Sequence, residues 1–173
     1  MSNTEQDPCA AVPALAQHRW LQQLVGQWSF EGQADMGPGQ PAMKHAGQQT
    51  VRSLGELWVL CESQGSMPDG SPAHMLITLG YDPQKSAFVG TFVGSMMTHL
   101  WHYAGSLDAA GKVLTLDTEG PSFSGDGTLV RYQDIITLQG PEVYELASQV
   151  IQADGSWKRF MSATYRRVKA RNG

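Results

Sequence analysis

The sequence predicts an all-β protein, an antiparallel up-and-down barrel of about ten strands with one short N-terminal helix. A single segment near the N-terminus repeats apolar residues at helical spacing. From Gln27 onward the chain consists of short runs with alternating character, separated by glycine, proline and aspartate. Short connections favour antiparallel neighbours, and closure into a barrel removes the exposed edges of so long a sheet. A two-sheet sandwich is the alternative that this pattern leaves open.

The predicted helix lies within residues 13–26, PALAQHRWLQQLVG. Pro13 suits the first turn of a helix, and Gly26 is a typical stop signal. The apolar residues between Trp20 and Val25 share one face, which indicates an amphipathic helix that packs against the rest of the fold. Residues 1–12 hold few large apolar side chains, and we expect a flexible leader there.

The strands follow one another without a second helix between them. Asp-Gly pairs at 69–70 and 154–155 are hairpin signals, because both residue types tolerate the positive φ of a tight turn. The predicted strands span 27–34, 42–52, 57–66, 73–81, 86–93, 99–106, 112–118, 128–138, 142–151 and 156–167.

Length and charge point to one domain without a nucleic-acid or membrane partner. The 173 residues suffice for a single core, and no linker divides the chain, so we expect one barrel domain over residues 13–168 and a basic tail over 169–173. The net charge of −4 is spread along the chain, and no long apolar run is present. The N-terminus lacks a secretory signal pattern, which predicts a cytoplasmic protein. Cys9 and Cys61 do not form a disulfide framework or a metal-ligand pair by spacing.

The order of a helix, a Gly26-Gln27-Trp28 motif and a β meander ending in a basic strand resembles the lipocalin-like (calycin) barrels. The resemblance implies that the tryptophan packs at the closed end of the barrel beside a basic side chain of the last strand. Trp28 fits the first role, and Arg166 or Arg167 is the candidate for the second.

A closer resemblance covers residues 18–167. It rests on segments that occur in the right order, MGPGQPAMK, GYDPQKSAFVGTFVGSMMTHLW, GSLDAAGKVLTLDTEGP and SWKRFMSATYRR. The chain is similar in these to a bacterial domain-of-unknown-function family, the one numbered 1579, which implies a lipocalin-like barrel and no assigned activity. Nitrobindin-type haem proteins are a more distant relative. Their haem-ligating pattern near the chain end is missing here, since no histidine follows His102, and no cofactor is predicted.

The densest group of candidate site residues is VGSMMTHLWHY at 93–103. If a strand begins at His99, then His99, Trp101 and Tyr103 share one face, while His102 lies on the other, so the two histidines cannot share a metal ion. Flexible methionines such as Met96 either fill a core or make an adaptable ligand wall. We expect no metal site here.

Glu62 and Arg131 are charged residues within otherwise apolar strands. They point either to solvent or inward, and in the second case Arg131 would receive a ligand carboxylate or phosphate. Ser95 is a weak candidate nucleophile, with only His99 near in sequence as a base. The full set of predicted ligand-binding residues is His45, Glu62, Tyr81, Phe92, Ser95, Met96, His99, Trp101, Tyr103 and Arg131.

These observations predict a soluble barrel that binds a small apolar or amphipathic molecule in its interior. No glycine-rich phosphate loop, nucleophile elbow or zinc spacing is present, so no catalytic motif is recognised. Two alternatives stay open. One is a small calycin-type isomerase or hydrolase that uses His99, Tyr103, Glu62 and Arg131, and the other is a filled structural barrel that acts as a homodimer.

Overall fold

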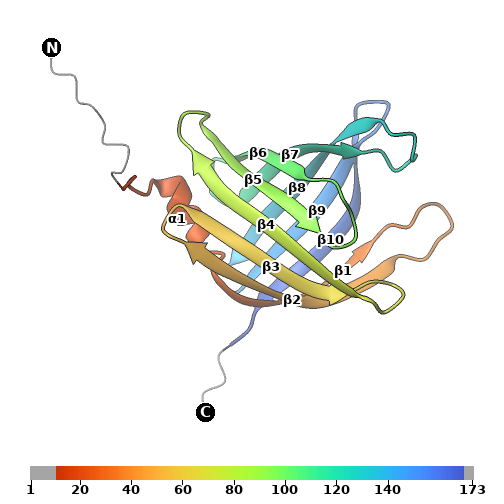
Figure 1. Ribbon diagram of the computed structural model, residues 1–173, viewed down its shortest axis with the longest axis horizontal. Coiled ribbons are helices and arrows are strands. Elements are labelled where there is room, and N and C mark those ends of the chain that lie inside the picture. The colour runs from red at the N-terminus through yellow and green to blue at the C-terminus, as the bar shows by residue number, and fades with distance from the viewer. Residues whose placement is uncertain (1–10, 170–173) are drawn as a thin grey trace.

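The computed structural model describes residues 11–169 and shows a closed antiparallel barrel of ten strands with one short helix. The strands are in the order β1-β10-β9-β8-β7-β6-β5-β4-β3-β2, so sequential strands are neighbours and β1 closes the ring against both β2 and β10 (Figure 1). The prediction of an up-and-down barrel is confirmed, and the two-sheet sandwich is excluded because no sheet edge is left open.

The strand boundaries lie within a few residues of those predicted. The elements are α1 (Ala16–Gln22), β1 (Gly26–Ala34), β2 (Met43–Leu54), β3 (Trp58–Ser66), β4 (Pro72–Asp82), β5 (Ala87–Gly94), β6 (Trp101–Leu107), β7 (Val113–Pro121), β8 (Leu129–Gly140), β9 (Val143–Ile151) and β10 (Trp157–Arg167). The sixth strand begins later than predicted. β6 starts at Trp101 and not at residue 99, so His99 lies in the preceding loop.

The helix is shorter than predicted. It covers Ala16–Gln22 and not the whole of 13–26, because Leu15 is extended and its N–H donates to Nδ1 of His18 at 2.9 Å. After Gln22 the chain tightens into three-residue turns, with the N–H of Val25 donating to the carbonyl of Gln22. No helix within residues 11–169 has the length and hydrophobicity needed to cross a lipid bilayer.

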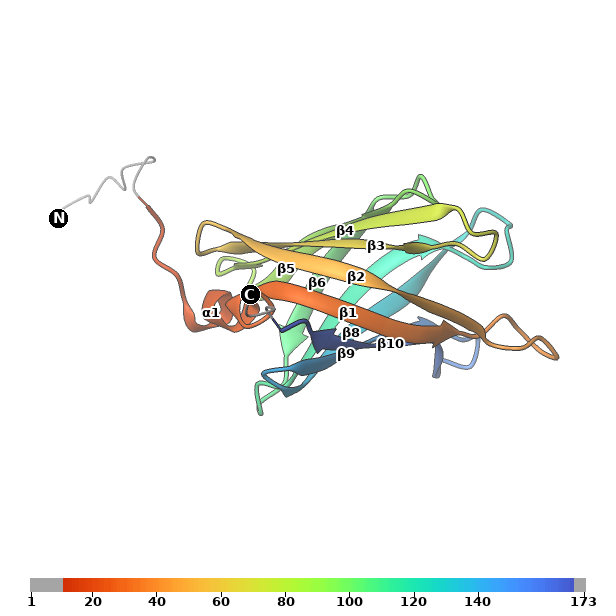
Figure 2. The same cartoon turned by 90° about the horizontal axis from the view of Figure 1, so that it is seen from below.

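The helix lies at one end of the barrel, beside the hairpins that join β2 to β3 and β4 to β5 (Figures 1 and 2). Leu21 and Leu24 are buried in the core. The indole N–H of Trp20 donates to the carbonyl of Gly111 at 2.8 Å, and Nε2 of His18 lies 3.0 Å from the carbonyl oxygen of Tyr81. These contacts make the helix end the closed end.

Trp28 and Arg167 pack against each other at the same end of the barrel. The guanidinium carbon of Arg167 lies 4.2 Å from the centre of the Trp28 ring, and the Trp28 indole N–H donates to the carbonyl of Leu24 at 2.8 Å. Of the two arginines considered, Arg167 therefore holds the tryptophan. It also explains Gly26, where a Cβ atom would lie 2.3 Å from Arg167 Nη1.

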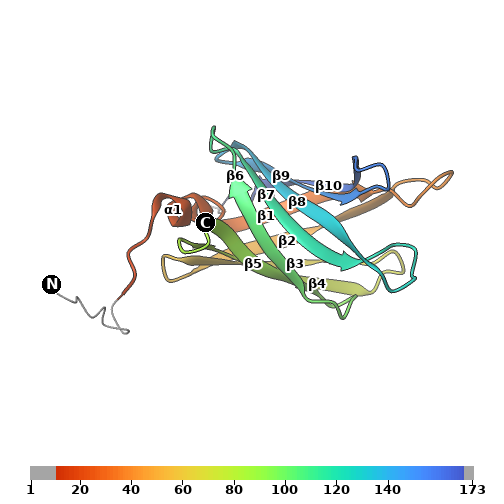
Figure 3. The same cartoon turned by 90° about the horizontal axis from the view of Figure 1, so that it is seen from above.

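At the opposite end, the hairpins of 34–43, 66–72, 94–101, 121–129 and 151–157 surround the mouth of the barrel (Figures 1 and 3). The Asp-Gly turns at 69–70 and 154–155 both lie there, as the hairpin signals predict. The expected leader and tail fall outside the described residues, apart from positions 11, 12 and 169, and so does Cys9. Those predictions, and the 13–168 domain boundary, stay predictions.

Candidate functional site

Several inward-facing apolar side chains of the barrel are only partly buried. Strand alternation directs one set of side chains inward, in register across the wall from β4 to β6, where Ile77 pairs with Phe92 and Phe92 with Trp101. Ile77, Phe92 and Trp101 are only partly buried, as are Met75 and Met161. An inward-pointing side chain in a closed barrel stays partly exposed only where space remains inside or at the mouth. We call this space the lumen.

One carboxyl group lies in the middle of the barrel, on its inner surface. Asp134 is on β8, and its side chain accepts hydrogen bonds from the hydroxyls of Tyr103 on β6 and Ser148 on β9. Tyr103 and Ser148 are themselves buried. Asp134 is not among the fully buried residues despite its central position, and its side chain points inward with those of Tyr132 and Ile136.

A second polar group lies nearer the closed end. The Tyr144 hydroxyl donates to Oε1 of Gln49, and Nε2 of Gln49 donates to the Ser63 hydroxyl at 2.9 Å. Tyr165 stacks on Tyr144 with 4.5 Å between ring centres. This hydrogen-bonded chain links β9, β2 and β3 through the interior and satisfies polar groups that burial would otherwise make costly.

Burial controls the acidities here. It raises the pKa of the Asp134 carboxyl, and the hydrogen bonds from Ser148 and Tyr103 offset only part of that rise. Burial also raises the pKa of the Cys61 thiol to about 12 and, together with the charge of Asp134, places the pKa of Tyr103 well above its ordinary value. Cys61 is thus a buried, protonated thiol and not a reactive thiolate.

Aromatic rings form an arc at the mouth. Trp101 meets Tyr132 edge-on at 5.1 Å, and Phe123 touches both Tyr132 and Phe160 at 5.7 and 5.0 Å. His99 continues the arc, with its ring 4.9 Å from that of Trp101. Phe123 is 70% exposed, so an apolar side chain stands free at the entrance.

The pairing between β6 and β7 covers only part of the two strands. Their pairing runs from Ala104–Asp117 to Leu107–Leu114 and stops, whereas both strands extend further towards the mouth. Nε2 of His99 lies 3.0 Å from the Glu119 carbonyl oxygen and bridges the separation. The ring of Trp101 packs directly on Gly120 at this place. A Cβ atom at position 120 would lie 2.1 Å from Trp101 Cζ3. A depression of about 460 Å³ opens outside this seam.

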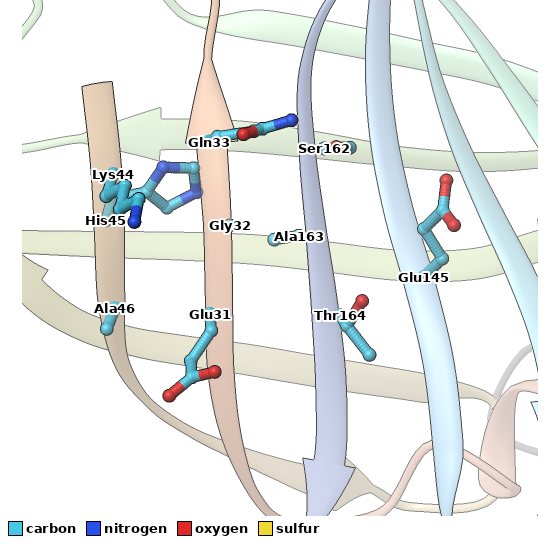
Figure 4. Close-up of a pocket in the computed structure, with 10 residues that line it drawn as sticks. All are labelled: Glu31, Gly32, Gln33, Lys44, His45, Ala46, Glu145, Ser162, Ala163 and Thr164. Atoms are coloured by element: carbon cyan, nitrogen blue, oxygen red, sulfur yellow. The ribbon is translucent and has the colours of Figure 1, made fainter. Parts of the chain in front are cut away.

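A second depression, of about 650 Å³, lies over β2, β1, β10 and β9. Figure 4 shows Glu31 and Gln33 on β1 between the residues of β2 and β10. Outward-pointing polar side chains such as Glu31, Lys44 and Thr164 line it, and Glu145 is occupied by a 3.0 Å ion pair with Arg159. The inward ring of His45 lies behind Gly32, and burial lowers the pKa of His45. This depression offers a ligand little apolar surface.

The predicted site residues separate into four groups, three of which lie inside the barrel or at its two ends. Phe92, Trp101 and Tyr103 face the lumen. His45 and His99 lie towards the mouth, and Ser95 and Met96 are in the β5–β6 loop, where the Ser95 hydroxyl accepts the N–H of His74 at 3.0 Å. Tyr81 packs at the closed end, edge-on to Phe88 and His18.

Glu62 and Arg131 lie outside the barrel, so neither lines the lumen. Glu62 pairs with Arg52 at 3.1 Å, and the Arg131 guanidinium lies 5.6 Å from the centre of the Trp157 ring. Alternation is the reason, since each occupies the strand face opposite that of its buried neighbours Cys61 and Tyr132. The four residues of the hypothetical isomerase or hydrolase site are therefore not brought together.

Sequence reasoning missed Asp134. A signal was present, because Tyr132, Asp134, Ile136 and Leu138 alternate along β8 and form its apolar face, with the carboxylate among them. Arg131 belongs to the other face, with Gln133. Ser148 and Gln49 carry no comparable signal, since short polar residues occur on both faces of their strands. Across residues 11–169, no three histidine, cysteine, aspartate or glutamate side chains are grouped to hold a metal ion.

Several solved structures are similar to this chain. The structure of Rv2717c from M. tuberculosis is similar with a TM-score of 0.58 and 13% identity, over 91% of this chain and 100% of that one. The structure of EF1p2_mFAP2b bound to DFHBI gives a TM-score of 0.48 with 15% identity, over 88% of this chain and 100% of that one. A redesigned barrel, b11L5F_LGL, gives 0.47 and 15%, over 87% and 96% of the two chains.

No curated protein sequence matches the chain significantly. A family model does match, over residues 14–167, which is nearly the whole described barrel. Its description is "Protein of unknown function (DUF1579)". The chain therefore belongs to this family of unknown function, as the four sequence segments predict.

Proposed function

We propose that this protein binds a small molecule with an apolar body inside the barrel. The observation that carries the proposal is the set of partly exposed inward side chains, because a barrel filled with its own side chains would bury Ile77 and Phe92 fully. Methionine and aromatic walls suit this role, since thioethers adapt to a ligand and rings give broad apolar contact. The mouth opposite α1 is the entrance.

A neutral, environment-sensitive dye tests the proposal. A phenylnaphthylamine dye is expected to show a saturable fluorescence increase with the wild-type protein. Ile77→Trp should fill the lumen and abolish the increase. Leu76→Trp is the matched control, because Leu76 is the next residue on β4 and points outward.

Two measurements decide the outcome. Circular dichroism checks that both variants keep the barrel, because overpacking at Ile77 costs about 1–3 kcal/mol. Native mass spectrometry of freshly purified protein checks for an added mass that is lost on denaturation. The proposal is wrong if the wild type neither carries such a mass nor binds the dye, or if Ile77→Trp folds and binds the dye as the wild type does.

A further inference from the structure

Among residues 11–169 the lumen has one acidic group, Asp134, and no lysine or arginine side chain contacts it. Asp134 points inward from the middle of β8, and the groups that contact its carboxyl are the hydroxyls of Tyr103 and Ser148. A carboxylate has about four lone-pair positions, and these two donors occupy one on each oxygen. Acceptor capacity therefore remains on an inward-pointing carboxyl of a residue that is not fully buried.

The basic side chains of residues 11–169 are placed elsewhere. Arg167 points inward at the closed end, but its guanidinium donates to the carbonyls of Pro141, Val25 and Gln23. Lys158 is at the rim of the mouth, paired with Asp35 at 3.0 Å. The remaining ones lie on α1, on the outer face, in turns or beyond the last strand; they are Arg19, Lys44, Arg52, Lys85, Lys112, Arg131, Arg159, Arg166 and Lys169.

A second observation concerns a hydroxyl near this carboxyl. Thr118 points inward on β7, opposite Tyr132 and two residue pairs from the Leu116–Asp134 pair, and it is 8% exposed. Its hydroxyl is the one buried side-chain oxygen or nitrogen among the described residues that lacks a hydrogen-bond partner. Such groups are rare and need an explanation, of which a missing ligand atom is one. Thr118 and Tyr103 both border the depression at the β6–β7 seam.

Aromatic surface lies beside the same position. Tyr132 is two residues before Asp134 on the same face of β8, and Trp101 is two residues before Tyr103 on β6. The face of an aromatic ring attracts a cation and does not attract an anion. A ligand carboxylate would meet the charge of Asp134 without an opposite charge to offset it, and this costs binding energy in a buried site.

We propose that the lumen ligand is an amphipathic amine, whose ammonium group donates to Asp134 while its apolar body contacts Phe92, Ile77 and the mouth aromatics. The inference rests on the proposed function and adds the class of head group. Anionic molecules such as fatty acids are then poor ligands, and neutral alcohols of the same body bind between the two. This order reverses the expectation that Arg131 receives a ligand carboxylate, because Arg131 is on the outer face.

Three probes with one body test the order, namely naphthylmethylamine, naphthylmethanol and naphthoate, each measured by calorimetry at neutral pH. In the wild type we expect the amine to bind about ten- to a hundredfold more tightly than the alcohol, the range for a hydrogen bond to a charged group. Naphthoate should bind more weakly than the alcohol. Asp134→Asn keeps the shape and removes the charge, so it should lower amine affinity to that of the alcohol and leave the alcohol unchanged.

Two further variants make the result specific. Asp117→Asn removes a carboxylate from the adjacent residue pair on the outer face, where it accepts from Gln133 at 2.8 Å, and should change nothing. Ser148→Ala keeps the Asp134 carboxyl and frees an acceptor position on its Oδ1, so amine binding should be retained or tightened. It also serves as the second test if Asp134→Asn does not fold.

The outcomes separate the two proposals. Equal binding of all three probes, tighter binding of naphthoate, or an unchanged amine preference in folded Asp134→Asn would overturn the amine inference while lumen binding stands. Loss of the amine preference in Ser148→Ala would also overturn it. If the wild type binds none of the three probes and no phenylnaphthylamine dye, both the inference and the proposed function are wrong.

Discussion

Arg167 joins three parts of the closed end through one guanidinium group. It donates to the carbonyls of Pro141 in the β8–β9 turn and of Val25 and Gln23 after α1, and it lies over Trp28. The planar guanidinium holds its N–H donors in fixed directions, which suits carbonyls on different sides of it. A lysine ammonium is compact and has fewer N–H donors. The charge alone therefore does not account for the residue at this position.

Arg167→Lys is expected to lower the free energy of unfolding by about 1–3 kcal/mol, since it keeps the charge but loses the stacking and most of the carbonyl contacts. Urea unfolding followed by circular dichroism measures the change. Arg166→Lys is the control, because Arg166 is the adjacent residue and is exposed on the outer face. Equal effects of the two substitutions would show that Arg167 is not a structural anchor.

Asp134 predicts a pH dependence of stability. Its pKa is raised above 3.8 in the folded protein by burial, so the folded state holds this proton more tightly than the unfolded state. The free energy of unfolding therefore falls as pH rises from about the unfolded value through the raised one. Asp134→Asn lacks this contribution, and its stability relative to wild type should rise as pH increases from about 4, the unfolded value, through the raised pKa of Asp134.

Urea unfolding of wild type and Asp134→Asn at matched pH values measures the difference. Tyr103, Tyr165 and Cys61 lie near the carboxyl and keep their protons over this range, because burial raises the pKa of each. They therefore do not contribute to the change in stability over this pH range. A stability difference that does not change with pH would mean that Asp134 has an ordinary pKa in the folded state.

The strands were predictable from the sequence to within a few residues, because alternation and turn residues are local signals. It was harder to predict which face of each strand points inward. On β4, Leu76 and Ile77 are adjacent, both apolar and both partly buried, and only pairing with the neighbouring strands places Ile77 inside. The separation of β6 from β7 depends on contacts between His99 and Glu119, which no local pattern reveals.

That seam predicts uneven protection of backbone amides. Residues Ala104–Leu107 of β6 pair with Leu114–Asp117 of β7. The mouth-side parts of these two strands do not pair with each other. Hydrogen exchange measured by mass spectrometry should be faster in peptides from 98–103 and 118–121 than in those from 104–107 and 113–117. The β8–β9 pair, which is continuous from Tyr132–Val150 to Leu138–Tyr144, is the protected reference. Uniform protection along β6 and β7 would show that the seam is closed in solution.

For the whole molecule, a lumen ligand links binding to unfolding. A ligand that binds only the folded barrel adds about 2.7 kcal/mol at a hundredfold excess over Kd. For a chain of this size we expect naphthylmethylamine to raise the Tm by several degrees, increasing with its concentration. Ile77→Trp should show no such rise, and Leu76→Trp should behave as wild type. A rise of equal size in Ile77→Trp would place the binding outside the lumen.

The two ends of the described chain meet at the closed end of the barrel. β1 begins and β10 finishes there, with Trp28 opposite Arg167, and α1 lies beside them, while every loop of the mouth is internal to the sequence (Figure 2). A fusion partner or surface attachment placed before residue 11 or after residue 169 therefore leaves the entrance unobstructed. The same geometry makes the mouth hairpins the place to graft new recognition sequences, because their length can vary without displacing either terminus.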